Sequence, residues 1–212
     1  MDEQLDLGKY QGKKLIAFDL YGTCIDHHLK IIRLSRDLLN TLKTNPITLQ
    51  DVQEWRVEID WNKIKIDQNL VDLIRRDIER TFLYPETLET LEYIKSKWYK
   101  IAVVSNLSKD YAEPLHRLIP KWLFDYEVLS FDVRSAKPDQ KIYEKLKTKS
   151  WIDFKDIIMI WDSFNADVEW SYKVWITPIY LKRNSEWIEE VHENWIDFIQ
   201  ISTLADLKEI LL

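Results

Sequence analysis

The chain has 212 residues, of which 46% are hydrophobic and 31% charged, and its formal net charge is −6 at pH 7. This length can supply one sizeable core, or one core plus a small inserted domain. The negative charge disfavours nucleic acid as a partner, and no apolar run reaches the roughly 18 to 20 residues that a membrane span needs. A single cysteine, Cys24, excludes an intrachain disulfide, and with no secretion signal at the N-terminus we expect a cytoplasmic protein.

The first predicted element is a buried strand over residues 14–18, an apolar run that stops at Asp19. The segment 25–82 differs in character. Its apolar residues fall near helical spacing on both sides of an alternating stretch, Val57 to Ile66, which is typical of a hairpin or of two short extended arms. We therefore predict a small, mostly helical insert at 25–82, and a core formed by residues 1–24 and 83–212.

From residue 84 onward, predicted helices and strands alternate. The helices are expected over residues 85–97, 111–118, 139–147, 168–174 and 204–211, and the strands over residues 100–104, 126–129, 157–160, 176–180 and 198–201. This alternation implies an α/β fold with a largely parallel sheet covered on both faces. Ligands of such sheets bind at the carboxyl ends of the strands.

Polar clusters follow four of these strands. They are residues 19–23, Ser105 with Asn106, Lys137 with Pro138, and Asp162 with Asp167. Neighbouring carboxylates call for a hard cation with oxygen ligands such as Mg²⁺, and a lysine can balance charge on a nucleophile or a transferring phosphoryl group. Each cluster alone could be a helix cap, but four in succession favour an active site.

The four clusters resemble the motifs of the haloacid-dehalogenase-like (HAD) superfamily. FDLYGT is similar to the first motif, VVSN to the second, the lysine of SAKPDQKIY to the third, and DSFNAD to the fourth. The resemblance covers nearly the whole chain. It implies a Rossmann-like, three-layer α/β/α core with a parallel sheet, and it makes the insert at 25–82 a small helical cap domain.

The resemblance also implies a role for each matched residue. Asp19 would be the nucleophile and a metal ligand, with Lys137 paired to it and the carbonyl of Tyr21 as a second ligand. The phosphate or other substrate group would be held by Thr23, Ser105 and the N–H of Asn106. Asp162 would bind Mg²⁺, and Asp167 would help to hold the ion directly or through water. The chemistry would be attack by the carboxylate, followed by hydrolysis of the aspartyl intermediate.

One residue departs from the phosphatase pattern. Tyr21 stands where phosphatases of the family place a second aspartate, which protonates the leaving group and contributes typically 10²–10⁴-fold to the rate. A tyrosine resembles the 2-haloacid dehalogenases instead, since halide leaves without a proton. The alternative interpretation is a tolerated variant within a phosphatase.

The fourth motif favours the phosphatase. The dehalogenases work without metal, whereas Asp162 completes a metal site that suits a phosphate ester. The first hypothesis is therefore a Mg²⁺-dependent hydrolase of a small phosphorylated metabolite, acting as a monomer or homodimer. A 2-haloacid dehalogenase and a non-catalytic ligand-binding domain are the alternatives.

Glycine is scarce and tryptophan abundant. The chain has 3 Gly and 10 Trp, whereas average usage predicts about 15 glycines. Trp98 follows a predicted helix, where a glycine with positive φ is expected, and Trp195 follows Asn194 at a predicted turn. Trp161 stands where the family's fourth motif has glycine. Some bacteria read the codon UGA as glycine, so our hypothesis is that most or all of these positions are glycine in the native protein. The alternative is that the tryptophans are genuine.

Overall fold

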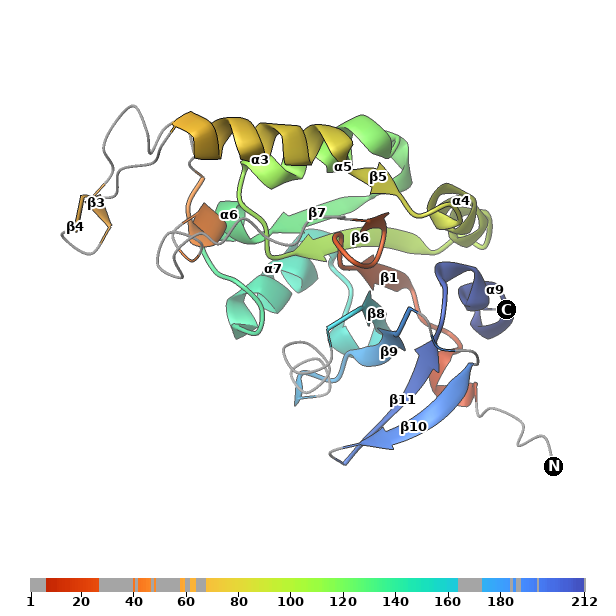
Figure 1. The fold of residues 1–212 in the computed structure, drawn as a ribbon. Coiled ribbons are helices and arrows are strands. Elements are labelled where there is room, and N and C mark those ends of the chain that lie inside the picture. The colour runs from red at the N-terminus through yellow and green to blue at the C-terminus, as the bar shows by residue number, and fades with distance from the viewer. Residues whose placement is uncertain are drawn as a thin grey trace.

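The computed structural model describes residues 7–26, 40, 42–46, 48, 58–59, 62–63, 68–163, 173–183, 185, 188–193 and 195–211. Its centre is a seven-stranded sheet with the order β10-β11-β9-β8-β1-β6-β7 (Figure 1). All neighbouring strands are parallel except the pair β10–β11, which is antiparallel. The strands are β1 (Leu15–Phe18), β6 (Lys100–Ser105), β7 (Tyr126–Leu129), β8 (Ile157–Trp161), β9 (Thr177–Leu181), β10 (Glu189–Glu193) and β11 (Ile196–Ile201).

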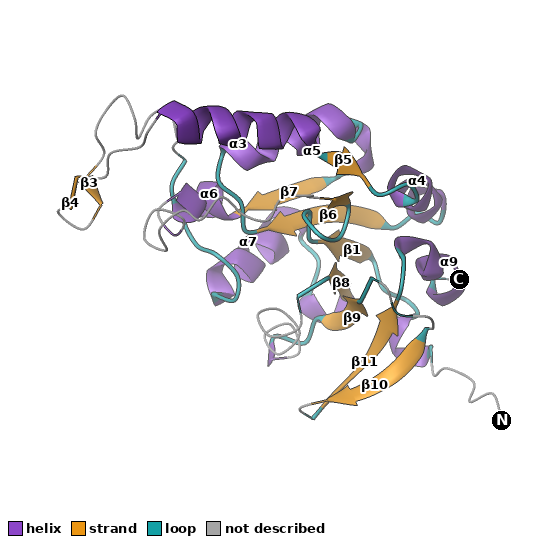
Figure 2. Ribbon diagram, viewed as in Figure 1, coloured by secondary structure: helices purple, strands orange, loops and turns teal. Residues whose placement is uncertain are grey.

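Helices cover both faces of this sheet (Figure 2). They are α4 (Thr87–Ser96), α5 (Glu113–Leu118), α6 (Ser130–Val133), α7 (Gln140–Ser150) and α9 (Leu207–Ile210), joined by the 3₁₀ turns η1 (Gly8–Tyr10), η2 (Asp110–Ala112), η3 (Lys121–Leu123), η4 (Phe154–Asp156) and η6 (Leu204–Asp206).

The core is divided into two apolar clusters by the sheet. Successive side chains of a strand point to opposite faces, so β1 serves both clusters. Ile16 and Phe18 pack in the cluster that includes residues of α4, α5 and α9, and Leu15 and Ala17 pack in the cluster that includes residues of α7. The predicted three-layer α/β/α fold is confirmed.

The described part of the insert contains one long helix and two short strand pairs. The helix is α3 (Gln68–Arg80). Strand β2 (Ile25–Asp26) pairs with β5 (Phe82–Leu83), so the two ends of the segment 25–82 lie side by side. Strands β3 (Glu58–Ile59) and β4 (Asn62–Lys63) form the hairpin that the alternation predicts. The division into a core and a cap domain stays a prediction.

Contacts between side chains and backbone hold α3 against the core. The Arg117 guanidinium on α5 donates to the Ile78 carbonyl at 2.8 Å, and the Tyr111 hydroxyl on η2 donates to the Asp77 carboxylate at 2.9 Å. Val71, Ile74 and Ile78 of α3 are buried, and Asp77 is its polar side-chain anchor.

The strands predicted from apolar runs are all present, but β10 was missed. Its sequence, Glu-Glu-Val-His-Glu, has no apolar run because the strand lies at the edge of the sheet and is mostly exposed. The predicted helix at 168–174 lies almost wholly outside the described residues. Within the described part of the chain, no helix is long and apolar enough to cross a membrane.

Tyr10 gives a test of the packing that joins the N-terminus to β9 and β11. Its buried hydroxyl donates to the Pro178 carbonyl at 3.3 Å and accepts from the Ile199 N–H at 2.9 Å. We expect Tyr10→Phe to lower the free energy of unfolding by about 1–3 kcal/mol, because two buried backbone groups lose their partner. Urea unfolding measures this loss.

The matched control is Tyr93→Phe. The Tyr93 hydroxyl also donates to backbone carbonyls, but these hydrogen bonds are only partly buried. In Tyr93→Phe, water can therefore donate to the carbonyls in place of the lost hydroxyl. Equal losses for the two variants would contradict the assigned role of Tyr10.

Candidate functional site

The strand β1 delivers Asp19 to the centre of the sheet's carboxyl edge. Phe18, the last residue of β1, is in register with Val103 of β6 and Ile160 of β8. The Asp19 N–H continues this pairing and donates to the Ile160 carbonyl at 2.9 Å. The residues that follow β6 and β8 therefore flank Asp19 on both sides.

The Asp19 carboxylate is held by a cation and a hydroxyl. Its Oδ2 lies 2.8 Å from the Lys137 ammonium, and its Oδ1 accepts from Ser105 Oγ at 2.5 Å and from the Leu20 N–H at 2.7 Å. The Lys137 side chain is 1% exposed and that of Asp19 is 15% exposed. A carboxylate fixed in this way has the orientation that nucleophilic attack requires, and its negative charge is partly offset.

Asn106 positions the lysine. Its side-chain amide donates to the Lys137 carbonyl at 2.9 Å and accepts from the Lys137 N–H at 2.7 Å. The sequence predicts that the Asn106 backbone faces substrate, and it gives no sign of this side-chain role. Ser130 braces the next residue similarly, since its hydroxyl accepts from the Leu107 N–H at 3.0 Å and donates to the Leu107 carbonyl at 3.1 Å.

Asp162 lies against the backbone of Gly22. Gly22 has φ +78°, and a Cβ added to it would stand 1.8 Å from Asp162 Oδ2. Only glycine leaves room for this carboxylate, and only glycine adopts that φ without strain. The Thr23 hydroxyl, in the same turn, is buried and has no hydrogen-bond partner among the described residues. Both features fit a turn shaped to receive a ligand.

The carboxylates of Asp19 and Asp162 lie at this edge, and Asp26 lines the same hollow as Asp162. Among the described residues no group of three or more His, Cys, Asp or Glu residues forms a metal cluster. Asp167 lies outside the described residues. Mg²⁺ is usually bound through one or two carboxylates, with waters and substrate phosphate completing its shell. The donor set therefore fits Mg²⁺ better than a metal that requires a full protein cage.

The side chain of Tyr21 contacts Tyr111, on the 3₁₀ turn η2. Its hydroxyl donates to the Tyr111 carbonyl at 3.1 Å, and the two rings pack edge to face with centroids 5.8 Å apart. Burial, followed by the nearby Asp77 carboxylate, raises the pKa of the Tyr21 phenol above its usual value. The phenol is thus neutral at pH 7 and its proton is already engaged.

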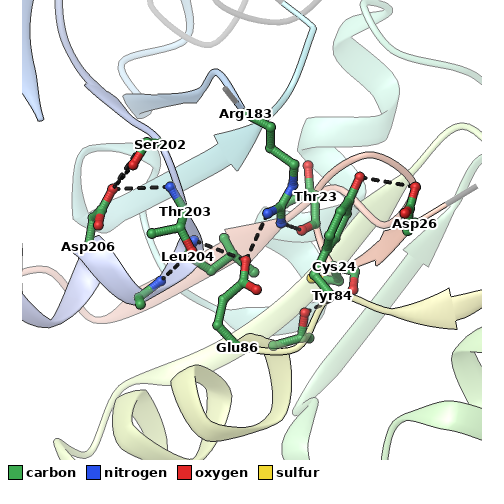
Figure 3. A network of polar contacts seen from close by, with 12 residues as sticks. Thr23, Cys24, Asp26, Tyr84, Glu86, Arg183, Ser202, Thr203, Leu204 and Asp206 are labelled. Atoms are coloured by element: carbon green, nitrogen blue, oxygen red, sulfur yellow. Dashed lines mark hydrogen bonds and ion pairs between the residues drawn. The ribbon is translucent and has the colours of Figure 1, made fainter. Parts of the chain in front are cut away.

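A second polar cluster adjoins the first, and no pattern in the sequence predicts it (Figure 3). Arg183, two residues after β9, donates to the carbonyls of Gly22 and Thr23 and forms an ion pair with Glu86. Gly22, Asp162 and Arg183 line one hollow together with Tyr84 and others. A lone arginine after a strand carries no signal by itself, because its partners come from distant parts of the chain.

Comparisons with known proteins identify the family of the chain. The model of the haloacid dehalogenase-like hydrolases matches residues 13–169. A glyceraldehyde 3-phosphate phosphatase from Methanothermobacter thermautotrophicus is 32% identical over 133 residues, which cover 60% of this chain and 58% of that protein. The aligned region thus spans little more than half of this relative.

Solved structures share the fold at low identity. A HAD-family enzyme from Bacteroides thetaiotaomicron, in complex with magnesium and inorganic phosphate, has a TM-score of 0.64 at 17% identity, covering 83% of this chain and 97% of its own. A 2-haloacid dehalogenase from Pseudomonas syringae has a TM-score of 0.62 at 18% identity, covering 93% and 97%. The family model matches well over half of the chain, and the chain therefore belongs to the haloacid dehalogenase-like hydrolases.

Proposed function

We propose that this hydrolase is a Mg²⁺-dependent phosphatase that acts on a small phosphorylated metabolite through an aspartyl-phosphate intermediate on Asp19. The observation that carries the proposal is the pairing of the Asp19 carboxylate with the Lys137 ammonium and the Ser105 hydroxyl at the carboxyl edge of the sheet. The named phosphatase relative supports the same reaction class.

In the first step an Asp19 oxygen attacks phosphorus, and the bond from phosphorus to the leaving oxygen breaks. The bonding electrons depart with the leaving group. In the second step a water oxygen attacks the same phosphorus, the bond between Asp19 and phosphorus breaks, and inorganic phosphate leaves. The proton that the water loses passes to solvent. Lys137 offsets the charge on the phosphoryl oxygens in both steps, while Ser105 keeps the carboxylate aligned.

Asp19, Asp162 and the Tyr21 carbonyl would hold Mg²⁺, together with Asp167 if that residue reaches the site. The ion would offset the negative charge of the transferring phosphoryl group. The close fit of Asp162 against Gly22 supports this assignment, because it brings a second carboxylate to the turn that follows Asp19.

The hydrogen bond and the raised pKa of the Tyr21 phenol limit which phosphate esters the site should hydrolyse. The phenol donates to the Tyr111 carbonyl and has a raised pKa, so it neither protonates a leaving alkoxide efficiently nor acts as a base at neutral pH. Leaving groups that are weak bases need no proton. The site should therefore favour aryl, acyl or enol phosphates over alkyl phosphates.

The test is phosphate release from p-nitrophenyl phosphate with Mg²⁺, with EDTA, and by an Asp19→Asn variant. We expect turnover with Mg²⁺, loss of turnover in EDTA, and a loss of at least about 10³-fold in kcat for the variant, because the amide is not a nucleophile. Glycerol phosphate should give a kcat/KM at least about 10²-fold lower than the aryl ester. Asp156→Asn, at a surface ion pair with Lys14, is the control and should retain full activity.

Phosphate release that continues in EDTA, or in the Asp19→Asn variant, would contradict the proposal. A glycerol phosphate rate equal to the aryl rate would instead show that another group supplies the proton.

Dehalogenation is the second candidate, favoured by Tyr21 and by the structural likeness to a 2-haloacid dehalogenase. Here Asp19 would attack carbon, halide would leave with the bonding electrons, and water would hydrolyse the resulting ester. Chloride release from 2-chloropropionate is its assay. We expect none, and metal-independent chloride release would replace the first candidate with the second.

A further inference from the structure

Two consecutive carbonyls of the turn after the nucleophile are held by one guanidinium. Arg183 Nε donates to the Gly22 carbonyl at 3.1 Å. Arg183 Nη2 donates to the Thr23 carbonyl at 2.7 Å (Figure 3). The next carbonyl, that of Cys24, accepts from the Thr87 hydroxyl at 2.9 Å. Residues of the core thus fix the backbone of this turn at three successive positions.

The guanidinium is itself fixed on two sides. Its Nη1 lies 2.8 Å from the Glu86 carboxylate, and it stacks on the Tyr84 ring with 3.2 Å between the guanidinium carbon and the ring centroid. Burial raises the pKa of Glu86, but hydrogen bonds from Arg183 and the backbone outweigh it, so the net pKa lies below its usual value. The ion pair is therefore fully formed at neutral pH.

The turn at residues 20–24, which Arg183 holds, lies between the two carboxylates of the site. Asp19 precedes it, and the Asp162 carboxylate lies against its Gly22. A shift of this backbone would therefore move the nucleophile relative to the second carboxylate. Misplacement by about 1 Å can cost 10²-fold in rate.

We propose that Arg183 is a positioning residue for the reaction, which acts by holding the turn at residues 20–24 rather than by touching substrate. This inference rests on the proposed phosphatase function. A lysine cannot replace it, because a single ammonium does not reach two carbonyls and Glu86 with the planar, forked geometry of a guanidinium.

Arg183→Lys and Arg183→Met test the proposal on the full chain. We expect kcat for p-nitrophenyl phosphate to fall about 10- to 100-fold with KM changed less than about twofold. Amide hydrogen exchange should rise in peptides covering residues 20–25, whose N–H groups of Gly22, Cys24 and Ile25 bond within the turn. The control Lys208→Met removes an ion pair to Glu89 of α4, the helix that Glu86 precedes, and should change neither readout.

Unchanged amide exchange in the turn of the Arg183 variants would overturn the proposal. A change confined to KM would also overturn it, because it would mean that Arg183 contacts the substrate. Exchange needs no turnover. If the wild-type chain releases no phosphate, the proposed function fails while the exchange result still decides whether Arg183 holds the turn.

A second, independent observation concerns the tryptophans. Four of them, Trp98, Trp151, Trp175 and Trp195, have φ of 67°, 58°, 67° and 68°. Among the described residues these four outnumber the glycines with positive φ, Gly12 and Gly22, and Arg134 is the one other residue of this kind. Left-handed backbone is uncommon for any residue but glycine, and a bulky side chain adds steric cost.

Each of the four stands where a chain usually turns on glycine. Trp98 and Trp151 end the helices α4 and α7, Trp175 precedes β9, and Trp195 lies in the tight turn between β10 and β11. Their exposed fractions are 93%, 92%, 81% and 87%, so burial of the indoles does not compensate for the strain.

Trp161 differs from these four because it is buried rather than exposed. It is fully buried beside Asp162, and its indole N–H has no hydrogen-bond partner among the described residues. An unpaired buried N–H is costly.

We infer that the native polypeptide carries glycine at positions 98, 151, 175 and 195, and also at position 161, because its gene is decoded with UGA as glycine. In the chain as printed, each of the four substitutions to glycine should raise the thermal midpoint by about 2–4 °C through relief of left-handed strain. Trp122→Gly is the control, since Trp122 is 61% exposed but has no positive φ, and it should give no gain.

Peptide masses of the protein from the organism that carries the gene decide the inference directly. Glycine masses at the four positions, and at position 161, are the expected result. Tryptophan masses there, or four variants that lose stability, would overturn it.

Discussion

The site depends on a buried charge that needs a partner. The Lys137 ammonium is almost completely removed from solvent, and the Asp19 carboxylate lies 2.8 Å from it. Removing one partner of such a pair leaves an uncompensated buried charge, which is strongly unfavourable. The fold therefore has to keep both groups in place, and the neighbouring hydrogen bonds serve that end. Ser105 fixes the carboxylate, and Asn106 fixes the backbone that carries the lysine.

The parallel sheet brings these residues together. Asp19 and Ser105 follow or end the adjacent strands β1 and β6, and Asp162 follows β8 on the other side of β1. Parallel strands present their carboxyl ends at one edge, so residues far apart in the sequence meet there. The insert begins at β2 and ends at β5, and because these two strands pair, its two ends lie side by side.

Much of this arrangement follows from sequence patterns with a direct physical meaning. Apolar runs predict the buried strands. Polar residues at or beyond the carboxyl ends of these strands predict the edge at which Asp19, Ser105 and Lys137 meet. The edge strand β10 escaped prediction, since a strand with one neighbour and exposed side chains needs no apolar run. Arg183 and Glu86 also escaped, because their partners are separated from them by 97 or more residues and no local pattern encodes such contacts.

The first motif predicts where Tyr21 lies relative to Asp19, but it does not predict what the Tyr21 hydroxyl binds. The sequence places a phenol where an acid is usual, and only the structure shows that its hydroxyl donates to the Tyr111 carbonyl. Similarly, the positive φ values of four tryptophans give backbone reasons for a composition that the sequence alone shows only as a count.

The proposed mechanism requires that Asp19 becomes phosphorylated. Rapid acid quenching during turnover of p-nitrophenyl phosphate, followed by peptide mass spectrometry, tests this directly. We expect a phosphoryl group on the peptide that contains Asp19, removable by hydroxylamine as expected of an acyl phosphate. Turnover with no phosphorylated peptide, or with the phosphoryl group on another residue, would contradict this mechanism.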